Sequence, residues 1–80
     1  MSDDAIDEAI LSFLSVSNGH WKKVAMVISR VANAMGKDLP DGDDGYERVA
    51  RRIEFLVSEG RLAAAGNIKN WRFSEVRRAE

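Results

Sequence analysis

The second half of the chain joins an amphipathic helix directly to a pair of short strands, and this unit constrains the fold more than any other feature. From Tyr46 to Glu59, apolar side chains recur at helical spacing on one face. Gly60 follows, and glycine is common just past the end of a helix. Residues 61–66 and 71–77 then flank a turn-rich tip, as in a β-hairpin. The pattern predicts a helix that ends at glycine and leads straight into a hairpin.

The first half of the chain predicts two more helices. Apolar residues at helical spacing place the first from about Asp4 to Leu14. A second stripe begins near His20 or Trp21 and ends before Gly36, where a left-handed helix cap is expected. The expected core is drawn from all three helices and the first hairpin strand: Ile6, Ile10, Phe13, Leu14, Trp21, Val24, Ile28, Val31, Val49, Ile53, Leu56 and Leu62.

Acidic residues crowd the start of the first helix, at Asp3, Asp4, Asp7 and Glu8. Negative charge there complements the positive end of the helix dipole, worth roughly 0.3–1 kcal/mol for a well-placed group. We therefore interpret the cluster as a helix start, with an acidic ligand site as the alternative.

Residues 37–45 form a polar loop with four aspartates, so calcium binding has to be considered. An EF-hand loop needs an oxygen ligand at its first position and glycine at its sixth. Either glycine of the loop in that register puts Lys37 or Pro40 first, and the pattern fails. We expect a solvated connector in which Asp43 or Asp44 caps the third helix, with adventitious cation binding as the alternative.

The residue types on which most enzyme chemistry depends are scarce. The chain has no cysteine and one histidine, His20, so it offers no thiolate metal site and no legible nucleophile and base. We expect a non-enzymatic protein without a cofactor, in which His20 serves packing or helix capping. Eighty residues predict one small domain over residues 1–80.

The same composition bears on location. The absence of cysteine is typical of an intracellular protein. The first residues are acidic where a secretory signal is basic, and no apolar run approaches the roughly 20 residues needed to cross a bilayer. We expect a cytoplasmic protein that makes no membrane contact.

Charge is distributed unevenly along the chain. Residues 1–44 hold four basic and eight acidic side chains, whereas residues 45–80 hold eight basic and five acidic ones. The two parts therefore carry −4 and +3, within a net charge of −1. This asymmetry favours approach of the second half to a polyanion.

The third helix presents an unusual outer face. Phe55 points away from the expected core, with Arg48 and Arg51 beside it and Arg52 at the rim. Three interpretations stay open: the hairpin or the C-terminal tail covers Phe55, a protein partner or second copy binds it, or it is inserted toward DNA. The candidate contact residues are the basic and aromatic residues of this helix and the hairpin: Arg48, Arg51, Arg52, Phe55, Lys69 and Arg72.

The hairpin register is ambiguous. Leu62 and Ala64 share a parity that would turn them toward the helices. In the second strand, Trp71 and Phe73 share a parity that Val76 breaks. Either a bulge lies near residues 74–75, or one of these apolar residues faces outward.

The overall pattern predicts an α+β, mainly α fold of the winged-helix type, with three helices and a C-terminal two-stranded hairpin. Gly60-Arg61-Leu62 and Ser74-Glu75-Val76-Arg77, with Gly66 and Arg72 between, resemble the C-terminal signature of an uncharacterised bacterial domain family. The opening at residues 21–25 resembles the second helix of that family. The resemblance implies an architecture and no activity.

The segment also looks like the end of bacterial winged-helix regulators, which are helix-turn-helix-like proteins. Two features depart from them: the connector before the third helix is long, and the strand residues 63–65 are uncharged alanines. The hairpin of residues 61–77 is called the wing. The partners expected from these observations are double-stranded DNA, contacted by the third helix and the wing, or a protein partner or second copy, bound at the Phe55 face.

Overall fold

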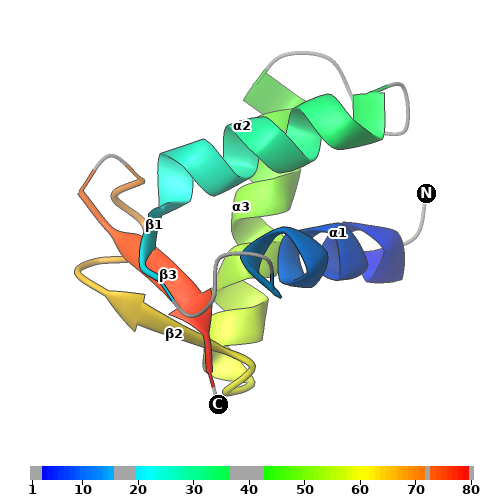
Figure 1. Ribbon diagram of the computed structural model, residues 1–80. Helices are drawn as coiled ribbons and strands as arrows, with labels where there is room; N and C mark the ends of the chain where they lie inside the picture. Colours follow the sequence, from blue (N-terminus) through cyan, green and yellow to red (C-terminus); the bar gives the residue numbers. More distant parts are fainter. Residues whose placement is uncertain (1–2, 16–19, 37–42, 72, 80) are drawn as a thin grey trace.

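The computed structural model describes residues 3–15, 20–36, 43–71 and 73–79 (Figure 1). Helices α1 and α2 both lie across α3, and a small sheet stands at one end of them (Figure 1). The α+β, mainly α fold predicted from the sequence is confirmed. The elements in chain order are α1 (Asp3–Ser15), β1 (Lys22–Lys23), α2 (Val24–Met35), α3 (Asp43–Ser58), β2 (Leu62–Ala65) and β3 (Glu75–Arg78).

The sheet has three antiparallel strands in the order β1-β3-β2, one strand more than the predicted hairpin. The expected start of the second helix at His20 or Trp21 is wrong, because Lys22 and Lys23 form β1 and the helix begins at Val24. The first backbone N–H groups of a helix have no partner within it. Here Val24 N–H donates to the Ser74 carbonyl (3.0 Å) and Ala25 N–H donates to the Trp71 carbonyl (3.2 Å). The base of the wing thus determines where α2 begins.

The second hairpin strand begins later than predicted. Phe73 N–H donates to the Asn70 carbonyl (3.1 Å), and the buried Ser74 hydroxyl donates to the same oxygen (2.8 Å). These bonds close a turn, so that β3 starts only at Glu75 and Trp71 and Phe73 precede it. Val76 is fully buried and Phe73 is 79% exposed. The parity conflict is therefore resolved by a shorter strand in which Val76 faces the core.

The predicted inward parity of the first hairpin strand agrees with the register, because Ala64 pairs with the buried Val76, but only Leu62 is itself buried. Leu62 is buried beside the end of α3, as predicted. Ala64 is exposed, although it shares the parity of Leu62. It lies two residues farther along an edge strand, where β3 is its only partner strand among the described residues.

One buried cluster joins the helices to the sheet, and the three helices contact one another pairwise. Trp21, predicted in the core, is instead 39% exposed, because it precedes β1 and has left the face of α2. Phe13 is only half-buried at the margin of the cluster. The core residues are Ile6, Ile10, Leu14, Val24, Val27, Ile28, Val31, Val49, Ala50, Ile53, Leu56, Leu62 and Val76.

Both ends of α3 matter for the site. The helix begins at Asp43, so Asp43 and Asp44 lie in its first turn. A capping residue would instead precede that turn. At the other end, Gly60 N–H donates to the Val57 carbonyl (3.1 Å) and Arg61 N–H to the Leu56 carbonyl (2.9 Å). This bond pair, with φ +77° at Gly60, is the Schellman motif. It turns the chain directly into β2.

Candidate nucleic-acid interface

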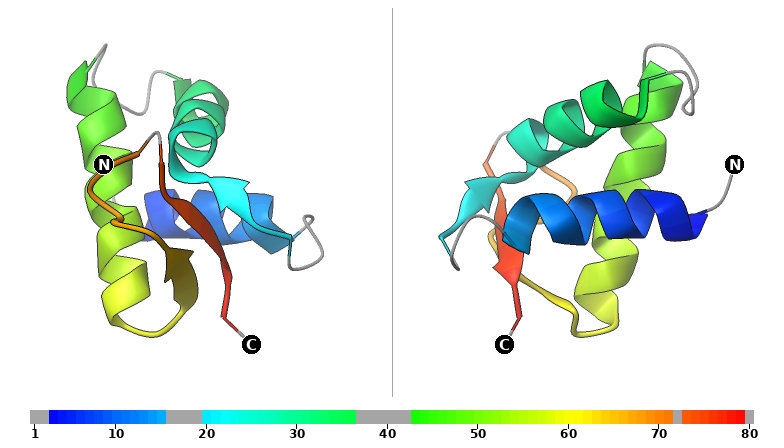
Figure 2. Two further views of the ribbon diagram at one scale, coloured as in Figure 1. Left: turned by 90° about the vertical axis from the view of Figure 1, so that its left-hand side faces the viewer. Right: turned by 45° about the vertical axis from the view of Figure 1, so that its right-hand side comes forward.

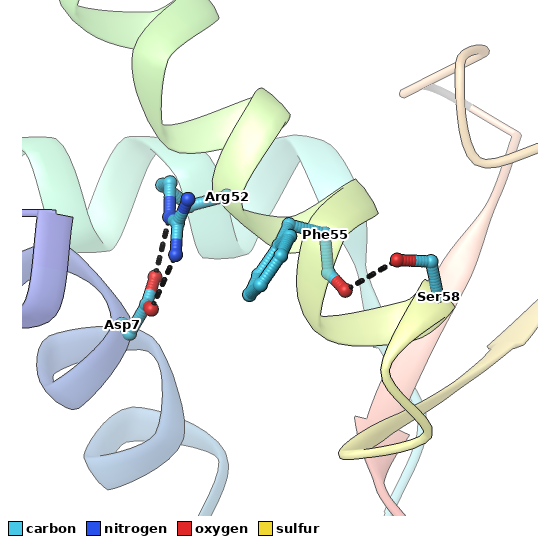
Figure 3. A network of polar contacts seen from close by, with 4 residues as sticks. All are labelled: Asp7, Arg52, Phe55 and Ser58. Carbon is cyan, nitrogen blue, oxygen red and sulfur yellow. Dashed lines mark hydrogen bonds and ion pairs between the residues drawn. The ribbon is translucent and has the colours of Figure 1, made fainter.

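An ion pair connects α1 to α3. Arg52 donates from Nε to Asp7 Oδ1 (2.8 Å) and from Nη2 to Asp7 Oδ2 (2.7 Å), a two-bond arrangement that matches guanidinium to carboxylate (Figure 3). The two side chains are 20% and 11% exposed. Arg52, predicted to contact a partner, is therefore bonded to α1, and its side chain is mostly buried. The sequence pattern does not pair Arg52 with Asp7, because 45 residues separate them.

Phe55 lies on the outer face of α3, as the helical periodicity predicts, and is 43% exposed. The Arg52 guanidinium carbon stands 4.3 Å from the centre of its ring. Figure 3 shows the ring beside Arg52, on the side of α3 that approaches α1. Arg52 thus covers part of the Phe55 ring through a cation–π contact. The sequence left open what covers this ring.

The remaining charges on α3 are mixed in sign. Arg48 and Arg51 are exposed, as predicted. Arg51 Nη2 lies 3.2 Å from Glu47 Oε1, four residues earlier on the same helix. These three residues line a surface depression together with Asp44. Positive and negative groups therefore alternate along the exposed side of the helix.

The outer face of the sheet gathers basic and aromatic side chains. Successive residues of a strand point to opposite faces. Because Val76 faces the core, its neighbours Glu75 and Arg77 face outward, with Lys23 opposite Glu75 and Ala63 opposite Arg77. The left-hand view of Figure 2 shows this face turned to the viewer, with no helix of the described chain in front of it.

Trp21 belongs to this outer face. The register of β1 and β3 places it opposite Arg77, and the Arg77 guanidinium carbon is 4.6 Å from the centre of its ring. The sequence pattern does not reveal this position, because Trp21 also fits the apolar stripe of α2. Only the strand pairing distinguishes a place on the sheet from a place on the helix. We call Trp21, Lys23, Glu75 and Arg77, with the small side chains of Ala63 and Ala65, the outer sheet face.

Further cations surround the sheet. Lys22 is half-buried in β1, and Arg78 is exposed and donates to the Ser15 hydroxyl at 3.0 Å. At the wing tip Lys69 is exposed, and its backbone N–H donates to Asn67 Oδ1 at 3.0 Å. Arg72, the last predicted contact residue, lies outside the described residues. The predicted contact residues therefore belong to α3 and to the wing, with the outer sheet face as an addition.

A small apolar hollow opens between the start of α2 and the start of α3. It is lined by Ala25, Ile28, Ser29, Tyr46 and Trp71 and has a volume of about 210 Å³. Pockets that hold drug-sized ligands or cofactors measure roughly 300–1,000 Å³. The hollow is therefore smaller than such pockets.

No known protein family, curated protein or solved structure matches this chain at a significant level. Within the described ranges, no helix combines the length and the apolar character needed to cross a membrane. Among those same residues, no three histidine, aspartate or glutamate side chains are grouped so as to hold a metal ion. The site has to be interpreted from its own geometry.

Proposed function

We propose that this domain is a non-enzymatic binding module that contacts the phosphate backbone of DNA. In this proposal the sheet and the wing make most of the contacts, and α3 contributes Arg48 and Arg51. The observation that carries the proposal is the concentration of cations on and around the sheet, where Glu75 is the only carboxylate of β1 and β3. Phosphate contacts from lysine and arginine supply most of the affinity in non-specific DNA binding.

The charge of α3 supports the assignment of most phosphate contacts to the sheet and the wing. The helix sequence holds four carboxylates and three arginines. One of the arginines, Arg52, is bonded to Asp7, and Arg51 lies beside Glu47. A helix with such a balance of charge attracts phosphate less than β1 and β3 do, where four cations face one carboxylate.

Titration of a mixed-sequence DNA duplex at several salt concentrations tests the proposal. The variant Lys23→Gln/Arg77→Gln removes two positive charges from the outer sheet face, and its control Arg48→Gln/Arg51→Gln removes the same number from α3. We expect the sheet variant to flatten the dependence of log K on log salt by about 0.9 per lost phosphate contact. The α3 control should change the slope less. Absence of salt-dependent binding to the duplex by the folded domain would remove duplex contact as a function.

A second candidate function is protein association through the Phe55 face. The supporting observation is the pairing of an exposed phenylalanine with Arg52, since aromatic residues and arginine are enriched at interfaces. In this candidate Arg52 is held in place by Asp7 before any partner arrives. It predicts a dimer or complex whose formation depends on Phe55.

Two further proposals rest on the sequence. The cysteine-free composition supports a cytoplasmic location. The Gly60-Arg61-Leu62 and Ser74-Glu75-Val76-Arg77 segments support membership of the uncharacterised bacterial domain family that they resemble.

A further inference from the structure

We propose that the outer sheet face binds single-stranded nucleic acid, with an unpaired base stacked at Trp21 and phosphates held by Lys23 and Arg77. This inference rests on the proposed function and specifies the form of its ligand. It is carried by the position of Trp21, a large aromatic side chain that the fold leaves 39% exposed among cations.

The sheet holds Trp21 in this exposed position. Pairing of Lys22 with Val76 and of Lys23 with Glu75 fixes β1 against the central strand. Arg77, on that strand, then lies over the indole at 4.6 Å. An aromatic ring and a guanidinium plane are the two side-chain groups on which proteins stack unpaired bases.

The surroundings of Trp21 suit an anionic chain with flat rings. Lys23 and Arg77 are exposed on the same face, where a sugar-phosphate backbone beside the stacked base would pass. Ala63 and Ala65 carry only methyl groups, so β2 raises no bulky side chain over this part of the face. Glu75, the one carboxylate of the outer sheet face as defined above, is half-buried. Lys23 lies opposite Glu75 and offsets its charge.

The shape of the outer sheet face favours binding of a single strand over binding of a duplex. The major groove of B-DNA, about 12 Å wide, admits a helix or a two-stranded ribbon. A three-stranded sheet face is too broad for it, and base faces within a duplex are stacked on one another. An unpaired strand offers its base faces, so Trp21 contributes to binding only when the strand is unpaired.

The test uses three ligands of equal length: oligo(dT), an abasic oligonucleotide with the same number of phosphates, and a duplex. The Trp71→Phe variant leaves Trp21 as the only tryptophan of the chain. We expect oligo(dT) to quench Trp21 fluorescence and the abasic strand to leave it nearly unchanged. Trp71 is half-buried, so the Trp71→Phe substitution changes its packing. If that variant is unstable, the indole N–H signal of Trp21 in NMR spectra of the unaltered chain provides the same readout.

Affinity variants complete the test. Trp21→Ala should weaken oligo(dT) binding by about tenfold or more and leave abasic binding within about twofold. Tyr46→Ala is the matched control, because Tyr46 is an aromatic residue of similar exposure (41%) on α3, outside the outer sheet face and the wing, and it should leave both affinities unchanged. Circular dichroism verifies that each variant is folded.

Two results would overturn the inference, and they differ in what they say of the proposed function. Equal affinity for oligo(dT) and the abasic strand, with Trp21 signals unchanged, excludes stacking and leaves phosphate contact standing. Absence of salt-dependent binding to all three ligands excludes the proposed function as well.

Discussion

At the scale of single residues, the Asp7–Arg52 pair decides which arginine of α3 is available to a ligand. Three arginines lie within five positions of one another, and the sequence offers no means to rank them. Arg52 reaches α1 and makes two bonds with Asp7 there, whereas Arg51 pairs with Glu47 on its own helix. The same residue type therefore serves packing in one case and surface charge in the other.

We predict that Asp7→Asn lowers the free energy of unfolding by about 2–3 kcal/mol, because it removes a carboxylate from a largely desolvated guanidinium. Glu47→Gln is the matched control. Its pair is exposed, so the loss should stay below about 0.5 kcal/mol. Urea denaturation followed by circular dichroism measures both. Losses of similar size would show that the Asp7–Arg52 pair contributes no more than a surface contact.

At the scale of elements, the glycines after α3 and after β2 set the geometry of the wing. Both have positive φ, +77° at Gly60 and +81° at Gly66. Their surroundings differ. A Cβ at Gly60 would meet nothing within 4 Å, whereas a Cβ at Gly66 would lie 3.0 Å from the Phe73 carbonyl oxygen. The obstructing atom at Gly66 belongs to the backbone of Phe73, which cannot move aside as a flexible side chain would.

We predict a loss of about 1 kcal/mol for Gly60→Ala, which is the strain of a left-handed alanine. Gly66→Ala should lose about 2 kcal/mol or more, because the contact with Phe73 adds to the same strain. Gly60→Asn should fall between glycine and alanine, since asparagine tolerates this conformation. Thermal and urea unfolding give the ranking. A Gly60→Ala variant as unstable as Gly66→Ala would contradict the steric argument.

At the scale of the whole molecule, the fold places an excess of cations at the sheet and charges of both signs along α3. Basic residues surround the sheet, while the exposed side of α3 carries Phe55 between charges of both signs. Arg52 covers part of Phe55. A stable interface usually buries about 800 Å² per partner, far more than one partly covered ring supplies.

We therefore expect the free domain to be monomeric, with the same sedimentation coefficient at low and high concentration. Phe55→Ser should leave this coefficient unchanged. Phe73→Ser is the matched control, because Phe73 is exposed on the wing, away from α3. A dimer that Phe55→Ser abolishes and Phe73→Ser preserves would favour protein association over DNA contact.

Local pattern was sufficient for much of the fold. Helical spacing located all three helices, and glycine after an apolar stripe located the ends of α2 and α3. It failed at Trp21, because a two-residue strand is too short to show an alternation of its own. It failed again at Trp71 and Phe73, whose apparent alternation belongs to a turn held by the Asn70 carbonyl.

What the sequence determined by itself was the set of amphipathic elements and the surplus of positive charge in the second half. Both follow from spacing and composition, which act over a few neighbouring residues. The tertiary structure alone decided the partner of Arg52, the third strand and the exposure of Trp21. Each depends on a contact between residues far apart in the chain: Asp7 with Arg52, Lys22 with Val76, and Arg77 with Trp21.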